Sequence, residues 1–88
     1  MEINYENADY YGQVEDTEER SIRNGKGVLK YHSGRIYQGP WLDDQRNGEG
    51  YEQFENGNVY KGNFEKGRAH GKGVYNWVSG EVYEGEWV

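Results

Sequence analysis

The chain has 88 residues, of which 33% are hydrophobic and 16% aromatic, with no cysteine and a formal net charge of −6. This length allows one small domain with a small core, and the absence of cysteine excludes disulfides and thiolate metal sites. The acidity lies in residues 1–24, with seven acids and two bases, whereas residues 25–88 hold nine acids and eight bases. Neither part offers the basic stripe that nucleic acid requires, and no apolar run reaches membrane-spanning length.

Residues 1–9 carry no repeat pattern, and we expect a flexible or partner-ordered tail there. Tyr10, Gly12 and Val14 then alternate along a predicted strand, which opens a divergent first unit over residues 10–36. The loop of this unit is four residues longer than the loop of the next unit. Terminal repeats are commonly atypical because they cap an array, so we place the start of the array at residue 10.

From residue 37 onward the chain repeats with a period of 23 residues. A Tyr-x-Gly-x-aromatic segment begins at Tyr37, Tyr60 and Tyr83, and glycines recur in the columns 25/48/71, 27/50/73 and 34/57/80. A fixed period of this size indicates an array of identical supersecondary units. We expect complete units over residues 37–59 and 60–82 and a terminal half-unit over residues 83–88, so that the array spans residues 10–88.

The turn glycines decide the register of the predicted hairpins. A two-residue loop at Ser33–Gly34 would place Tyr31 and Tyr37 on opposite faces of the sheet, whereas a three-residue loop with a left-handed glycine gathers them on one face. We predict the three-residue loop, because scattered aromatic rings would leave neither face able to bury area. The predicted fold is all-β, an elongated single-layer antiparallel meander of stacked hairpins. Four glycines leave room in it for neighbouring rings, at Gly27, Gly39, Gly50 and Gly62.

The segment Tyr37-x-Gly39-x-Trp41, followed by Gly48-x-Gly50, resembles the MORN (membrane occupation and recognition nexus) repeat. The resemblance covers residues 10–88 and implies a twisted strip of stacked hairpins. It also implies a scaffold or adaptor role, as in junctophilins, radial-spoke head components of cilia, adaptors for myosin tails and division scaffolds. In enzymes that carry the motif, another domain performs catalysis. Val14 in place of an aromatic residue departs from the pattern.

The aromatic residues are the candidate partner-binding side chains, although they also form the only core that this fold can have. The candidates are Tyr31, Trp41, Phe54, Phe64, Trp77, Tyr83 and Trp87. The acid pairs Glu15–Asp16 and Asp43–Asp44 lie at polar loop tips, where catalysis by a buried carboxyl is not expected. His32 and His70 are too few to form a metal site. We therefore expect no catalytic residue, no cofactor and no metal ion.

We expect protein partners, either a helix or peptide on the aromatic face or a strand paired at the C-terminal edge. End-to-end pairing of two copies would satisfy the same edge. The expected function is a non-enzymatic scaffold or adaptor subunit of a larger assembly, in the cytoplasm and in a cytoskeletal or ciliary structure. Two alternatives stay open. One is a regulatory subunit of an enzyme, and the other is a peripheral membrane adaptor that binds anionic phospholipid through Lys26, Lys30, Lys61, Lys66, Arg68 and Lys72.

Overall fold

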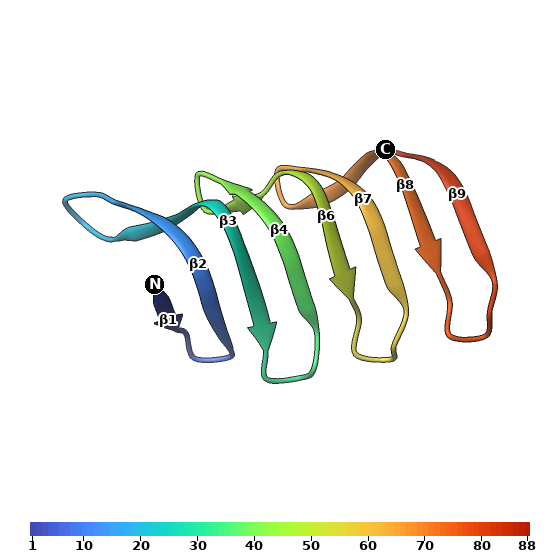
Figure 1. The fold of residues 1–88 in the computed structure, drawn as a ribbon, viewed down its shortest axis with the longest axis horizontal. Coiled ribbons are helices and arrows are strands. Elements are labelled where there is room, and N and C mark those ends of the chain that lie inside the picture. The colour runs from blue at the N-terminus through green and yellow to red at the C-terminus, as the bar shows by residue number, and fades with distance from the viewer.

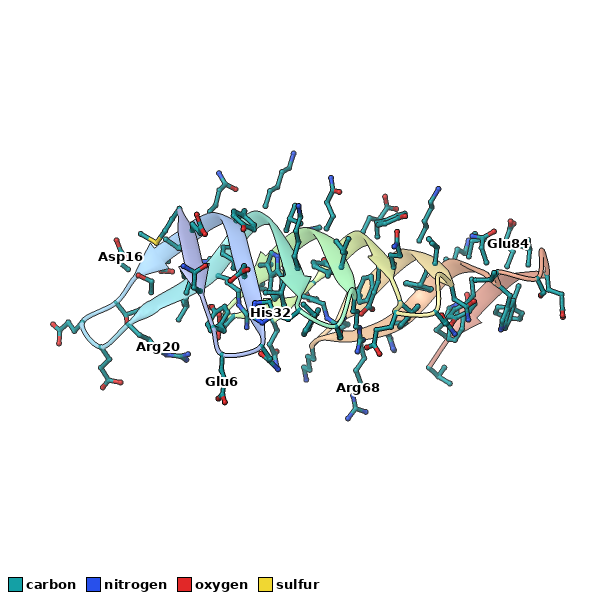
Figure 2. The ribbon with its side chains drawn as sticks, turned by 90° about the horizontal axis from the view of Figure 1, so that it is seen from below. Glu6, Asp16, Arg20, His32, Arg68 and Glu84 are labelled. Atoms are coloured by element: carbon teal, nitrogen blue, oxygen red, sulfur yellow. The ribbon has the colours of Figure 1, made fainter.

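The computed structural model describes residues 1–88, which form one open antiparallel sheet of nine strands (Figure 1). The strands are β1 (Glu2–Asn4), β2 (Ala8–Asp16), β3 (Ser21–Tyr31), β4 (Ile36–Leu42), β5 (Gln45–Arg46), β6 (Gly48–Gln53), β7 (Val59–Glu65), β8 (Arg68–Asn76) and β9 (Val82–Trp87). They follow one another across the sheet in chain order, except that β5 pairs only with β4. The strip measures 45 × 25 × 16 Å, and the view in Figure 2 shows how narrow it is. The prediction of an all-β single-layer meander is confirmed.

The short turns have the predicted three-residue geometry. The amide of Tyr31 donates to the carbonyl of Arg35 at 2.8 Å, and Gly34 is in the left-handed region with a φ of 105°. Gly27 consequently pairs with Gly39, as the register argument requires. The same turn hydrogen bonds recur in the next two repeats. The strands therefore pair in the register that places the aromatic rings on one face of the sheet.

The longer turns are tighter than the polar residues suggested. Leu42 pairs with Gln45, so the loop between them contains only Asp43 and Asp44, both with positive φ of 48° and 68°. Two central residues with positive φ define a type I′ turn, whose twist matches that of the flanking strands. The turn after β7 is equally tight, because Glu65 pairs with Arg68, whereas the first unit keeps a four-residue loop between Asp16 and Ser21.

The core is built from tyrosines that lie over glycines. Tyr10, Tyr37 and Tyr60 are 0%, 0% and 1% exposed. The ring of Tyr37 lies over Gly39 on its own strand and Gly50 on the next, and a Cβ added at Gly50 would be 2.7 Å from the Tyr37 hydroxyl oxygen. That hydroxyl donates to the carbonyl of Pro40 at 2.8 Å. Each glycine is therefore needed for the space that a side chain would take.

The larger aromatic residues fill the spaces between these tyrosines. Trp41 packs edge-on against both Tyr10 and Tyr37, with ring centroids 5.6 and 5.1 Å apart. Phe64 packs in the same way between Tyr37 and Tyr60, at 5.1 Å from each. We call the continuous series the ring ladder, which consists of Tyr10, Trp41, Tyr37, Phe64, Tyr60, Trp87 and Tyr83. The ladder connects every repeat to the next. Each edge-to-face pair contributes about 0.5–1.5 kcal/mol beyond the area that it buries, so these contacts stabilise the stacking of the repeats.

The structure differs from the expectation of a tail over residues 1–9. Residues 2–4 form β1, which pairs antiparallel with β2, and the amide of Gly12 donates to the carbonyl of Met1 at 2.9 Å. Ala8 is 2% exposed and belongs to the core. The tail was expected because these residues lack the repeat pattern. A segment without the pattern can nevertheless form a strand, because pairing with the edge of β2 needs only backbone hydrogen bonds.

Candidate interaction surfaces

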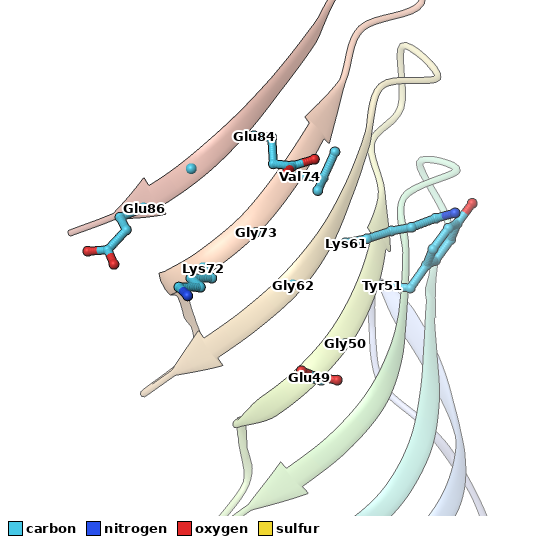
Figure 3. Close-up of a pocket in the computed structure, with 11 residues that line it drawn as sticks. Glu49, Gly50, Tyr51, Lys61, Gly62, Lys72, Gly73, Val74, Glu84 and Glu86 are labelled. Carbon is cyan, nitrogen blue, oxygen red and sulfur yellow. The ribbon is translucent and has the colours of Figure 1, made fainter.

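A groove runs across the face of the sheet opposite the ring ladder. Over β6 to β9 it encloses about 820 Å³, and its floor is the backbone of Gly50, Gly62, Gly73 and Gly85 (Figure 3). Its walls carry Glu49, Tyr51, Lys61, Lys72, Val74, Glu84 and Glu86. A second hollow of about 490 Å³ continues over β3, β4 and β6. The groove therefore lies between the outward-pointing side chains that flank the glycine column, over backbone whose own Cβ positions point to the ring ladder on the other face.

The charges of the groove are mixed. Lys72 pairs in register with Glu86, and the Lys61 ammonium nitrogen lies 5.7 Å from the centroid of the Tyr51 ring. Three wall residues are acidic and two are basic. The expected electrostatic attraction to an anionic surface is offset where acids and bases interleave in this way.

Arginines cover the ring ladder where the strands approach the longer turns. The Arg23 guanidinium lies 4.3 Å from the centroid of the Trp41 ring and donates to the Asp44 carboxylate at 2.7 Å. One repeat later, Arg46 lies over Phe64 in the same way and donates to the carbonyl of Gly67. Burial raises the pKa of Asp44, but the hydrogen bonds and charge of Arg23 outweigh this and hold that pKa below its usual value.

A buried charge lies at the centre of the array. Glu52 is 3% exposed, and one of its carboxylate oxygens accepts from Arg35 at 2.5 Å and from Arg46 at 2.8 Å. The equivalent residues of the neighbouring repeats are Leu29 and Tyr75. We call Glu52, Arg35 and Arg46 the triad. Sequence reasoning missed it, because its three residues come from three different columns of the repeat and the combination occurs in one repeat only.

The buried tyrosines have shifted acidities. The pKa of Tyr37 is raised to about 12, mainly by burial; the charge of Arg46 lowers this pKa and the charge of Glu52 raises it. Burial also raises the pKa values of Tyr10 and Tyr60. These hydroxyls stay protonated at neutral pH and donate to backbone carbonyls, so their chemical role is structural.

The acidic pairs and histidines of the sequence are engaged in local contacts. Glu15 accepts from the Asn24 amide at 3.2 Å, and Asp16 accepts from the Ser21 hydroxyl at 2.5 Å. Each histidine faces one carboxylate, His32 at 3.4 Å and His70 at 3.2 Å. No three potential ligands gather in a metal-binding arrangement. The chain contains no helix that could span a membrane.

The structure separates the seven predicted contact residues by exposure. Trp41 and Phe64 are 5% and 3% exposed inside the ring ladder, which corrects their assignment as partner contacts. Tyr31, Phe54 and Trp87 are partly buried and pack against the core. Only Trp77 and Tyr83 are substantially accessible, at 40% and 43%.

Both accessible aromatic residues belong to one end of the strip. Five of the nine exposed large apolar residues lie within residues 77–88. Strand β9 has a hydrogen-bonded neighbour on one side only (Figure 1). We call this region the open end, defined by Trp77, Val78, Val82, Tyr83 and the free edge of β9.

Tyr83 occupies the same position in its repeat as Tyr60 does in the middle of the strip. It packs edge-on against Trp87 at 5.4 Å, and its hydroxyl donates to the carbonyl of Glu86 at 3.2 Å. A Cβ added at Gly85 would lie 2.6 Å from that hydroxyl oxygen. Tyr83 therefore has the contacts of a ladder tyrosine on its inner side and solvent on its outer side.

Comparison with known families agrees with this architecture. A family model of the MORN repeat matches residues 19–34, 37–59 and 60–82, which together make up most of the chain. The chain belongs to the MORN-repeat family, whose repeats are modules for interaction with proteins or membranes. No curated protein matches the chain.

Proposed function

We propose that this chain is a non-enzymatic scaffold or adaptor subunit that binds a protein partner at its open end, within a larger assembly. The proposal rests on one contrast. Tyr83 is 43% exposed, whereas the equivalent Tyr10, Tyr37 and Tyr60 are at most 1% exposed. A ring that is positioned for burial but left accessible is a suitable anchor for a partner.

The energetic gain is adequate for a specific contact. Tyrosine and tryptophan side chains each bury 150–250 Å² when fully covered. The accessible parts of Trp77 and Tyr83 would together contribute about 4 kcal/mol at 25 cal/mol per Å². Aromatic anchors of this kind dominate many protein interfaces, and the edge of β9 adds backbone hydrogen bonds.

The non-enzymatic part of the proposal is supported by the state of the acidic groups. Asp44 is held by Arg23, and Glu52 is held by two arginines, so both carboxylates are already neutralised by neighbouring charge. Location in the cytoplasm, in a cytoskeletal or ciliary structure, is proposed from the resemblance to family members alone.

The alternative of an anionic lipid ligand receives less support. Of the two groove lysines, Lys72 pairs in register with Glu86 and Lys61 lies over the Tyr51 ring. The exposed aromatic residues are accompanied by Glu81, Glu84 and Glu86 rather than by bases. Flotation of the chain with vesicles containing phosphatidylserine tests this directly. Salt-sensitive co-flotation would favour the lipid ligand over the protein partner.

Position-specific photo-crosslinking tests the protein partner. The photoreactive residue p-benzoylphenylalanine replaces Tyr83 in one variant and Tyr11 in another, because Tyr11 is 41% exposed at the other end of the strip. We expect a discrete protein adduct in extract of the source cells from position 83 only, suppressed by excess unlabelled chain. Equal labelling from both positions, or no adduct, would refute the proposal. The identity of the adduct separates a structural assembly from a regulated enzyme.

A further inference from the structure

We propose that three residue pairs inside the strip specify the order in which its strands pair. This order is a property of the chain itself and does not depend on any partner. In each pair one residue lies two positions before a ladder tyrosine, and the other lies opposite that tyrosine on the strand that follows. We call them the neighbour pairs, which are Ala8 with Leu29, Arg35 with Glu52, and Asn58 with Tyr75.

The ring ladder does not distinguish one strand order from another. Strands β4 and β8 run antiparallel to each other, so a chain that extruded β6 and β7 could pair them in the same register. Tyr37 would then lie over Gly73 in place of Gly50, and neither glycine has a side chain that could tell the two apart. Such a skipped pairing would leave one hairpin unburied, yet the contacts that remain would be native-like. Misassembly of this kind is a characteristic failure of repeat proteins.

The neighbour pairs differ in chemistry from one strand pairing to the next. Both residues of the first pair belong to the apolar core and are 2% and 4% exposed. In the second pair, Arg35 donates to the buried Glu52 carboxylate at 2.5 Å. In the third pair, the buried Asn58 side chain donates to the Tyr75 hydroxyl at 3.1 Å. An apolar, an ionic and a neutral polar contact therefore follow one another along the strip.

An exchange of partners would break these matches. If β4 paired with β8, Arg35 would lie beside Tyr75, which offers no negative charge. If β2 paired with β6, Ala8 would lie beside Glu52, which would lose one of its two arginines. Removal of one partner from a buried charge pair is strongly destabilising, and single polar residues specify register in coiled coils in the same way. The neighbour pairs thus penalise skipped pairings and leave the native order unaffected.

Moving the ionic pair to another strand pairing tests whether the match itself matters. The unmodified chain, Tyr75→Glu, Asn58→Arg and the double variant are compared at full length by circular dichroism during heating. We expect each single variant to lower the Tm and the double variant to melt at a higher temperature than Tyr75→Glu. If Tyr75→Glu does not melt cooperatively, the expected result is a cooperative transition regained in the double variant.

Asn56→Arg is the matched control, because it makes the same substitution at an exposed position of the same turn. Combined with Tyr75→Glu, it should recover much less of the lost Tm than Asn58→Arg does. Equal recovery by the two arginines would assign the effect to net charge and overturn the proposal. Absence of any recovery by Asn58→Arg would overturn it as well.

Disulfide trapping measures a skipped pairing directly, because the chain has no cysteine of its own. Gln38 pairs with Tyr51 and Val74 pairs with Lys61, so Gln38 and Val74 are three strand spacings apart, about 14 Å. A disulfide requires Cα atoms within about 7 Å of each other. In Gln38→Cys with Val74→Cys, an intramolecular disulfide therefore reports pairing of β4 with β8.

This cysteine reporter is placed in three backgrounds, and its oxidation in glutathione buffer is followed by mass spectrometry. Arg35→Asn with Glu52→Tyr makes the second neighbour pair a copy of the third, so β4 then matches β8. We expect about tenfold more disulfide, or more, in this background than with the native pairs. Glu52→Gln breaks the match without creating a copy and should crosslink less than the copied background. An equal rise in Glu52→Gln would indicate a loosened sheet and overturn the proposal, as would the absence of a rise in the copied background.

Discussion

Replacement of Gly73 by alanine should destabilise the whole strip, because the new methyl group would overlap a buried ring. The added Cβ would lie 2.2 Å from the Tyr60 hydroxyl oxygen and 2.5 Å from two ring carbons. Ordinary contact requires 3.4–4 Å, so the ring has to move by more than an ångström. Tyr60 is 1% exposed and packs edge-on against Phe64 and Trp87, which leaves it no free direction.

The size of the effect can be worked out from these contacts. Overpacking a well-packed site costs about 1–3 kcal/mol. Weakening of the two edge-to-face pairs adds about 1–2 kcal/mol. Reduced chain entropy of the unfolded alanine variant offsets about 0.5–1 kcal/mol. The net loss is about 3 kcal/mol, which corresponds to a fall in Tm of about 10–20 °C for a domain of this size.

Gly85 provides a matched control, because it pairs with Gly73 in the register of β8 and β9. A Cβ at Gly85 would also meet a tyrosine hydroxyl, at 2.6 Å, but that tyrosine is Tyr83 and can swing into solvent. We expect Gly85→Ala to cost about 1 kcal/mol or less, measured by circular dichroism during heating and by urea titration. An equal loss in both variants, or an unchanged Tm for Gly73→Ala, would refute the role assigned to the buried ring.

Three further predictions concern charged and titratable groups. Tyr37 keeps its proton in the folded state up to a pKa of about 12, so stability should fall as pH rises from 10 to 12. Its share of that loss, about 2.7 kcal/mol, should be missing in Tyr37→Phe urea titrations. Glu52→Gln should cost about 3 kcal/mol in urea titrations at pH 7, because Arg35 then lacks its buried carboxylate, and a cost below 0.5 kcal/mol would contradict the triad. Asp44→Asn should cost about 1–2 kcal/mol at pH 7 through its bonds to Arg23. Because the folded-state pKa of Asp44 is lowered, this difference should be present above its ordinary value of 3.8 and vanish as pH falls through the lowered pKa.

The sequence predicted the parts of the fold that recur. The 23-residue period indicated stacked hairpins, and the need to gather the aromatic rings on one face selected the three-residue loop that ends at Gly34. The first inference needed only that equivalent residues occupy equivalent positions, and the second needed only that one face buries area. They hold because the repeats do share one backbone geometry.

The parts that could not be predicted depend on position along the array. Trp41 and Trp87 share a column, yet Trp41 is buried between the tyrosines of the first two units while Trp87 is partly exposed. Periodicity identifies the column and not the neighbours, so it could not separate core rings from accessible ones. The buried position of Glu52 could not be predicted either, because its two arginine partners come from other columns of the repeat and from other turns.

The ring ladder also determines how such a chain can change in length. Each large aromatic residue bridges the tyrosine of its own repeat and that of the repeat before it, as Phe64 does between Tyr60 and Tyr37. Loss of residues 37–59 would bring Phe64 to the place that Trp41 holds against Tyr10, so the series would close again without a gap. Loss of a shorter segment from the strands would leave a ring without its glycine or a tyrosine without its bridging ring, whereas the loops tolerate a difference in length, as the first unit shows. The ring ladder therefore lengthens or shortens by whole repeats.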